Sequence, residues 1–157
     1  MAAKKDAKKR EDKMAAQSIK TLEDFGHTIA NEIKTESPPE FTLPIRAKNN
    51  ISFDEKASVL RLGDKRGSRR FLNVAHTRKF MQSMLIAAAC KEYIGMDRTV
   101  GKRELYYNLK HSLPNSKENT FDDDTESGTT LNDIEASLGL LRERLHIEAK
   151  ARGSIYG

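Results

Sequence analysis

The chain has 157 residues, which is enough for one hydrophobic core with an added arm but too short for two cores. Its 28 lysines and arginines against 23 aspartates and glutamates give a formal net charge of +5, which favours a polyanionic partner, nucleic acid before a membrane surface. The single cysteine, Cys90, excludes a disulfide within the chain, and the longest apolar run is too short to span a bilayer, so the sequence predicts a cytoplasmic protein.

The first 36 residues are expected to form a charged tail and a helical arm. Residues 1–13 are mostly charged and lack apolar periodicity, which predicts a disordered tail or the frayed start of a helix. From Met14 onwards, apolar or small residues recur at steps of four and three, which predicts a helix that ends before Pro38. This seam is expected to pack on its own domain, the alternative being contact with a different subunit. It consists of Ala15, Ile19, Leu22, Gly26, Ile29 and Ile33.

Residues 37–157 are expected to form one domain of the α+β class. Short strands are predicted at 41–46, 51–54 and 58–62, because turn-like polar residues separate these apolar-rich segments. The basic segment 63–70 has two glycines but lacks the G-K-[ST] sequence of a phosphate-binding loop. It is therefore predicted as a loop that either contacts a DNA backbone or is simply solvated.

Two helices are predicted next along the chain. Asn73 is expected to cap a central core helix that runs to about Ile94. A second helix is expected to start at Gly101 or Lys102 and to end near Ser112, just before a Leu-Pro sequence.

In the last third of the chain, the sequence predicts a loop, a helix and a hairpin. The acidic stretch 115–128 is expected to be a loop, and Thr130 is expected to open a third helix with Asp133 at the capping-box position. Segments 145–148 and 154–156 are expected to pair as a β-hairpin. Three helices followed by a hairpin is the order of a winged helix-turn-helix. The predicted buried stripe of the third helix is Leu131, Ile134, Leu138, Leu141 and Leu145.

The second predicted helix carries a pair of candidate catalytic residues. Arg103 and Tyr107 are four residues apart and therefore share one helical face. A phenol with a pKa near about 10 is a poor nucleophile when neutral. A nearby guanidinium favours the phenolate and can stabilise the charge that builds on an attacked phosphate. This spacing is common on helices, so taken alone it favours an ordinary surface pair over a catalytic one.

Several strings in the chain resemble one family. The sequence Arg-Glu-Leu-Tyr-Tyr at 103–107 resembles the nucleophile motif of the topoisomerase VI A-subunit family, and that of its relative, the meiotic DNA double-strand-break transesterase. Other strings match in order and at family-like spacing from about Glu40 to the end of the chain. They lie at 43–46, 50–54, 62–65, 69–70, 78–82, 118–123, 126–127, 133–135, 141–143 and Gly153.

The resemblance implies a fold, an activity and roles for individual residues. It implies a CAP-like winged-helix domain in which Tyr107 becomes linked to a DNA 5′ end, Arg103 assists in the transition state and Tyr106 is structural. It also implies ATP-dependent, type IIB double-strand passage by an A-subunit homodimer, assembled as a heterotetramer with an ATP-binding B-type ATPase subunit. Mg²⁺ is expected from a Toprim domain into which the family continues beyond Gly157. The Gly-Thr-Thr-Leu sequence at 128–131 departs from the family pattern.

No metal site is predicted within the chain. The acidic run 122–126 could suggest Mg²⁺ ligands, but it follows no apolar strand, and acids before a helix are favoured by the helix dipole. His111 shares the face of Tyr107 and is either a base or an exposed residue near a helix end. The basic side chains expected to contact DNA lie on the second helix, the third helix and the wing. They are Lys102, Arg142, Arg144, Lys150 and Arg152.

Two other functions are compatible with the fold and charge. The main alternative is a non-enzymatic winged-helix regulator that binds DNA, and fold alone does not separate it from an enzyme. The Arg103–Tyr107 pair separates the two, because a regulator does not require it. A third possibility, an interaction module that uses the seam of the N-terminal helix, leaves the rest of the chain without a role.

Overall fold

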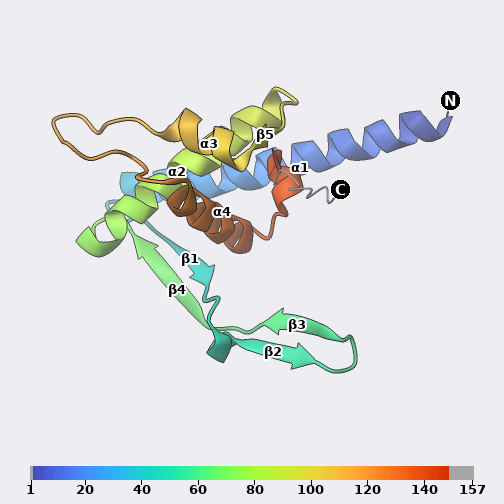
Figure 1. The fold of residues 1–157 in the computed structure, drawn as a ribbon, viewed down its shortest axis with the longest axis horizontal. Helices are drawn as coiled ribbons and strands as arrows, with labels where there is room; N and C mark the ends of the chain where they lie inside the picture. Colours follow the sequence, from blue (N-terminus) through green and yellow to red (C-terminus); the bar gives the residue numbers. More distant parts are fainter. Residues whose placement is uncertain (1, 149–157) are drawn as a thin grey trace, which may run out of the picture.

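A computed structural model describes residues 2–148, and its fold is α+β, as predicted (Figure 1). Four α-helices and three two-stranded sheets make up this part of the chain. The helices are α1 (Ala2–Lys34), α2 (Val74–Gly95), α3 (Lys102–Leu109) and α4 (Asp124–Leu138). The strands are β1 (Glu40–Pro44), β2 (Ile51–Asp54), β3 (Val59–Leu62), β4 (Arg66–Arg70), β5 (Val100–Gly101) and β6 (Ile147–Glu148). Short 3-10 turns cover Lys48–Asn50 and Arg142–Leu145. No helix in this part of the chain is both long and apolar enough to cross a membrane.

Helix α1 is longer than predicted. It begins at Ala2, so of the two alternatives for residues 1–13, the start of a helix is the one found for residues 2–13, and the disordered tail is wrong there. Alanine, lysine, arginine and glutamate fill this segment, and these residues have high helix propensity even without a buried face. Further along, Leu22 and Ile29 are buried in the core, whereas Ile33 is exposed. The middle of the seam therefore packs on its own chain, while the first turns of α1 extend past the body (Figure 1).

Helix α2 is the central core helix that the sequence predicted. Its N-cap is Asn73, whose side chain accepts a hydrogen bond from the backbone N–H of Ala75 at 3.0 Å. Ile86 and Cys90 are fully buried on it. Burial raises the pKa of the Cys90 thiol to about 12, with a further contribution from the charge of Glu135.

A ribbon of two strands, β1 and β4, packs against α2 and α4. The two strands are antiparallel, with Leu43 opposite Gly67 and Phe41 opposite Arg69. Phe41 and Leu43 are buried beneath the ribbon. The prediction that 63–70 is entirely loop is therefore wrong for Arg66–Arg70. This segment has no apolar alternation of its own, and its backbone becomes a strand because β1 supplies the hydrogen-bonding partner.

The β2–β3 hairpin projects from the end of this ribbon (Figure 1). Asn50 holds its base: the side-chain amide donates to the carbonyl oxygens of Ile45 and Lys65, at 2.7 and 3.0 Å, and its oxygen accepts from the Lys65 N–H at 3.1 Å. Gly63 lies against this side chain, and a Cβ there would be 2.5 Å from Asn50 Oδ1. Only glycine fits this close approach.

Helix α4 starts earlier and ends earlier than predicted. It begins at Asp124 because Asp123 caps it, accepting from the Glu126 N–H at 2.7 Å, so the loop prediction is wrong for residues 124–128. Thr130 and Asp133 lie inside the helix and are buried, and Asp133 does not occupy a capping box. The helix ends at Gly139, which adopts the left-handed conformation with φ of 63°.

Two further predictions concern the residues after α4: the end of the apolar stripe and the β-hairpin. Leu141 falls outside the helix and is exposed, so the expected apolar stripe is interrupted there, although Leu145 is fully buried in the following 3-10 turn. Strand β6 pairs in parallel with β5, with Val100 opposite Ile147. The hairpin partner predicted at 154–156 lies outside the described residues.

Candidate active site

Helix α3 places the two tyrosines on different faces. Leu105 and Tyr106 are buried, whereas Tyr107 is 66% exposed. The start of α3 at Lys102 agrees with the prediction, and its end at Leu109 comes one turn earlier than Ser112. Helix α3 is therefore held by its buried face, which carries Leu105 and Tyr106, and exposes the phenol of Tyr107 to solvent.

Tyr106 anchors this helix to the segment that leads into α4. Its hydroxyl donates to the backbone carbonyl of Asp122 at 3.0 Å. The ammonium of Lys110 donates to the Tyr106 hydroxyl at 2.7 Å and lies 5.2 Å from the centre of its ring. This hydrogen bond, together with the nearby Tyr106, Asp122 and Tyr107, raises the pKa of Lys110 against a smaller opposing effect of burial. Tyr106 is thus both a core side chain and a polar anchor.

Tyr107 lies beside this anchor and is accessible to a large ligand. The rings of Tyr106 and Tyr107 have centroids 5.1 Å apart and planes inclined by 52°. Arg103, one turn earlier on α3, is also exposed, and its Nε lies 3.8 Å from a carboxylate oxygen of Asp124. That contact is long and solvent-exposed, so it leaves the guanidinium available to a phosphate. Tyr107 and Arg103 therefore share one open surface.

The acidic segment beside α3 is occupied by ion pairs and by a helix cap. Asp122 accepts from the Arg78 guanidinium at 2.8 Å, and Glu126 contacts Arg78 at 3.3 Å and Lys79 at 3.2 Å. Asp123 is the N-cap of α4. Within residues 2–148 no group of three or more histidine, cysteine or acidic side chains is arranged to hold a metal ion. The acids of this segment do not fit a Mg²⁺ site.

Glu126 is the most strongly perturbed of these carboxyl groups. Burial alone would raise its pKa, but the Asp122 backbone N–H, the Gln82 side chain, and the cations of Arg78 and Lys79 together lower it to about 2. The carboxylate is therefore ionised at neutral pH and tied to α2 on one side and to the start of α4 on the other. Glu126 thus connects α2 with Asp122, the residue whose carbonyl accepts the hydrogen bond of Tyr106.

The other predicted residues have different surroundings. Lys102 is half-buried at the start of α3, and His111 is exposed, with Nδ1 3.0 Å from the Leu109 carbonyl oxygen. Arg144 reaches α1, where it donates to the Met14 carbonyl and to Gln17 at 3.3 and 3.2 Å. Two of the expected DNA-binding residues, Lys150 and Arg152, lie outside the described residues.

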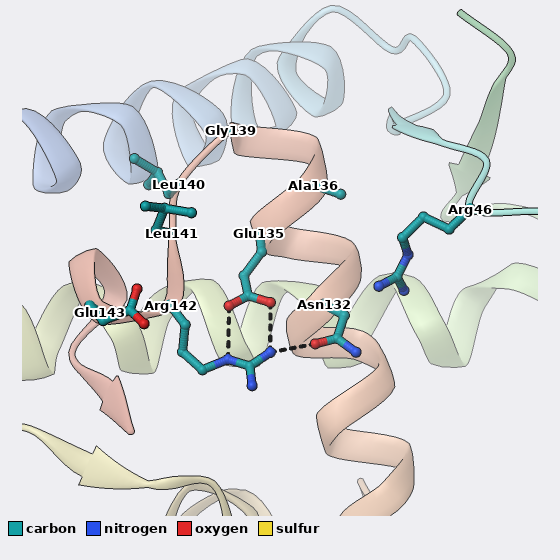
Figure 2. A pocket seen from close by; sticks show the side chains of 9 residues that line it. All are labelled: Arg46, Asn132, Glu135, Ala136, Gly139, Leu140, Leu141, Arg142 and Glu143. Carbon is teal, nitrogen blue, oxygen red and sulfur yellow. Dashed lines mark hydrogen bonds and ion pairs between the residues drawn. The ribbon is translucent and has the colours of Figure 1, made fainter. Parts of the chain in front are cut away.

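Arg142 lines a pocket of about 490 Å³ at the end of α4. Figure 2 shows its guanidinium turned back towards α4, where it makes two parallel hydrogen bonds of 2.8 and 2.7 Å with the Glu135 carboxylate and a further one with Asn132. Only 21% of the Arg142 side chain is exposed. These hydrogen bonds hold the 3-10 turn that follows α4 against that helix. The expectation that Arg142 binds DNA stays a prediction.

Two cations near α3 were missed by the sequence reasoning. Lys110 could have been found, because it comes four residues after Tyr106 and therefore lies one helical turn from it. The role of Arg78 depends on acids 40 or more positions further along the chain, at Asp122 and Glu126, and no local pattern signals such pairs.

The chain is similar to proteins of one known family. The family model for type IIB DNA topoisomerase matches residues 78–147, which contain most of α2 and all of α3 and α4. Two relatives, from Pyrococcus abyssi and Pyrococcus horikoshii, are 45% identical over 139 residues, and each is the A subunit of a type 2 DNA topoisomerase 6. The corresponding protein of Aeropyrum pernix is 32% identical over 138 residues.

These matches cover most of the chain but only part of each relative. The two Pyrococcus alignments include 88% of this chain and 36% of the relative, and the Aeropyrum alignment includes 83% and 36%. The matched class is that of the type IIB DNA topoisomerases. Within that class, the chain belongs to the topoisomerase VI A-subunit family, over a region little more than a third of the length of these relatives.

Proposed function

We propose that this chain is the tyrosine-bearing portion of the DNA-cleaving subunit of an ATP-dependent type IIB topoisomerase. One observation carries the proposal: Tyr107 is exposed on a helix that its neighbour Tyr106 fixes in place, and Arg103 lies one turn away on the same open surface. A nucleophile must be both accessible and rigidly held to reach a near-attack geometry. The matched relatives bear the name of the corresponding subunit.

The reaction that we propose is a transesterification. The oxygen of Tyr107 attacks a backbone phosphorus and loses its proton, a new oxygen–phosphorus bond forms, and the bond to the 3′ oxygen breaks. The products are a 5′-phosphotyrosyl link and a free 3′ hydroxyl, which takes up a proton. The guanidinium of Arg103 binds the phosphate oxygens on which negative charge builds. Because one ester replaces another, the reverse reaction reseals the strand without additional energy.

Other components belong to the same proposal. The acids within residues 2–148 do not fit a Mg²⁺ site, so we expect the divalent ion from a Toprim region outside them, where it would stabilise charge on the phosphate. We expect ATP to be bound by a B-type ATPase subunit, with two A and two B subunits in the complex. We also propose that α3, α4 and the chain beyond them form a winged helix that takes the substrate duplex.

The test is a search for the covalent link. The chain is placed in its full-length A subunit with the B subunit, double-stranded DNA, Mg²⁺ and ATP, and protein–DNA adducts are trapped by denaturation. Tyr107→Phe is expected to abolish the adduct. Tyr106→Phe loses the hydrogen bond to Asp122 but keeps the buried ring, so it is expected to reduce the adduct without abolishing it. An adduct that survives Tyr107→Phe contradicts the assignment of the nucleophile, whereas DNA binding by the unaltered protein without any adduct favours a DNA-binding regulator.

A further inference from the structure

An open pocket of about 530 Å³ lies between the β1–β4 ribbon, α4 and the first turn of α2, and the function proposed above does not use it. We call it the ribbon pocket. Its polar lining comes from Ser68, Arg46, Arg69, His76 and Asp133. Helix α4 lies between the ribbon and α3, so the ribbon pocket is on the other side of α4 from the helix that bears Tyr107 (Figure 1).

The charges in the ribbon pocket are not balanced. Arg46 donates to one oxygen of the Asp133 carboxylate at 2.6 Å, and Arg69 donates to the other oxygen at 3.3 Å. Asp133 is the only acidic residue of the lining, so two guanidinium groups share one carboxylate. The side chains of Arg46 and Arg69 remain 38% and 29% exposed, compared with 10% for Asp133. The pocket therefore carries an excess of positive charge even when His76 is neutral.

The ribbon pocket also has an excess of hydrogen-bond donors. A guanidinium has about five N–H donors in a planar fork. Among the described residues, Arg46 and Arg69 each make a side-chain hydrogen bond only to Asp133, so most of these donors have no protein acceptor. The Nδ1 atom of His76 is buried and also has no partner in residues 2–148. His76 lies in the first turn of α2, at the positive end of the helix dipole.

Surplus donors, net positive charge and a helix amino end together describe a site for an oxyanion. A phosphate group suits this site, because its oxygens can accept from both guanidinium groups at once while Asp133 keeps its own hydrogen bonds. The pocket is open and lies on a chain with a net charge of +5, which suits one phosphate of a long polyanion.

We propose that the ribbon pocket binds a backbone phosphate of duplex DNA. The site contacts DNA away from Tyr107 and orients the duplex without taking part in cleavage, as contacts to phosphate generally do. The choice of DNA as the source of the phosphate rests on the proposed function. The phosphate chemistry itself rests only on Arg46, Arg69, His76 and Asp133.

A purely structural interpretation of the same residues makes a different prediction. If Arg46 and Arg69 only hold the ribbon on α4, loss of either charge partner lowers stability and leaves anion binding unchanged. If the pocket binds phosphate, Arg69→Gln weakens binding, whereas Asp133→Asn strengthens it, because both guanidinium groups are then released to the ligand. The two substitutions therefore act in opposite directions on binding and in the same direction on stability.

The experiment measures DNA affinity of the 157-residue chain over a range of salt concentrations, with a duplex of mixed sequence. Arg69→Gln is expected to reduce affinity several-fold and to lower the slope of log K against log salt by about 0.9, the change for one lost phosphate contact. Asp133→Asn is expected to raise affinity several-fold. Arg70→Gln is the matched control, since Arg70 neighbours Arg69 but pairs with Glu40 at 2.9 Å on the other face of the ribbon.

Thermal unfolding of each variant establishes that it is folded, and a parallel titration with inorganic phosphate tests the source of the anion. Slopes that are equal for Arg69→Gln and Arg70→Gln overturn the proposal, as does weaker DNA binding by Asp133→Asn. A response to inorganic phosphate without any response to DNA overturns the assignment to a DNA backbone. Failure of Tyr107 to form an adduct does not affect these binding slopes, so the two proposals can fail independently.

Discussion

The hydroxyl of Tyr106 donates a 3.0 Å hydrogen bond to the backbone carbonyl of Asp122, which lies directly before the cap of α4. This one bond joins the helix that carries Tyr107 to the start of the next helix. The adjacent tyrosines thus differ in their surroundings: the buried ring of Tyr106 fixes the position of α3, and the ring of Tyr107 is open to solvent. A phenol on an unanchored eight-residue helix would lose this fixed position.

Replacing Arg103 with alanine should separate chemistry from folding. Because the Arg103 side chain is 72% exposed and its contact with Asp124 is long, we expect a change in the free energy of unfolding of only about 0.5 kcal/mol. Loss of one transition-state contact should slow cleavage about 100-fold or more in the assembled enzyme. Chemical denaturation and adduct formation are the measurements, with Arg61→Ala as the exposed-arginine control, since Arg61 is 64% exposed on β3 and pairs with Asp54, away from α3. Near-normal cleavage by Arg103→Ala would exclude the proposed role.

The chain alone should bind duplex DNA but not cut it. Binding is expected because of the net charge of +5, and it should fall steeply as salt is added, with little preference for sequence. Cutting is not expected, because no acidic cluster in the described residues is arranged to hold the divalent ion that supports phosphoryl transfer. Plasmid DNA incubated with the chain and Mg²⁺ or Mn²⁺, then treated with protease, should show no linear product. Linear product that disappears with Tyr107→Phe would prove this expectation wrong.

Glu126 should make the stability of the fold depend on acid pH. Its pKa is lowered to about 2 in the folded chain, so the ionised form is the stabilised one. Its contribution, on the order of 3 kcal/mol, is complete above the ordinary glutamate pKa near 4.5 and is lost as the pH falls from there towards 2. Glu126→Gln should remove this part of the pH dependence, as measured by denaturation between pH 5 and pH 2 at about unit steps.

The matched control for this measurement is Glu118→Gln. It removes the same charge from a side chain that is 69% exposed and lies 3.7 Å from Arg78, so its effect should be small. Equal pH profiles for the two variants would show that the buried network around Glu126 does not provide the stabilisation.

Replacing Gly63 with alanine should damage the base of the β2–β3 hairpin. A Cβ at this position would be 2.5 Å from Asn50 Oδ1, so the Asn50 side chain must move and its hydrogen bonds to Ile45 and Lys65 are weakened. We expect a loss of about 1–3 kcal/mol in the free energy of unfolding. The control is Gly26→Ala on α1, where a Cβ meets nothing within 4 Å and helix propensity should improve. A Gly63→Ala variant as stable as the parent would contradict the close approach.

Local signals in the sequence predicted the elements that depend on local hydrogen bonds. The cap at Asn73 and the start of α3 at Lys102 follow from neighbouring residues and were expected. The capping pair of Asp123 and Glu126 was also present in the sequence, but the surrounding acids and Gly128 favoured a loop, so the start of α4 was placed six residues too late. Where competing local signals overlap, tertiary packing decides the boundary.

Elements that depend on distant partners were not predictable in the same way. Arg66–Arg70 is a strand because β1 lies beside it, and nothing in its own composition favours that conformation. For the candidate site, the motif indicated Tyr107 and Arg103, but not the anchoring of Tyr106 on Asp122, which joins residues 16 positions apart. The sequence thus indicated the candidate side chains, while the structure shows how Tyr106 holds the helix that carries them.

The hydrogen bonds of Asn50 connect an exposed element to the body of the domain. The β2–β3 hairpin is held at its base by three hydrogen bonds of one side chain, whereas its own residues are largely exposed. These bonds join the hairpin to Ile45 and Lys65, which adjoin β1 and β4. Arg46 and Arg69 in turn tie the ribbon to Asp133 on α4. The hairpin is therefore linked, through four polar side chains, to the helix that packs against α3.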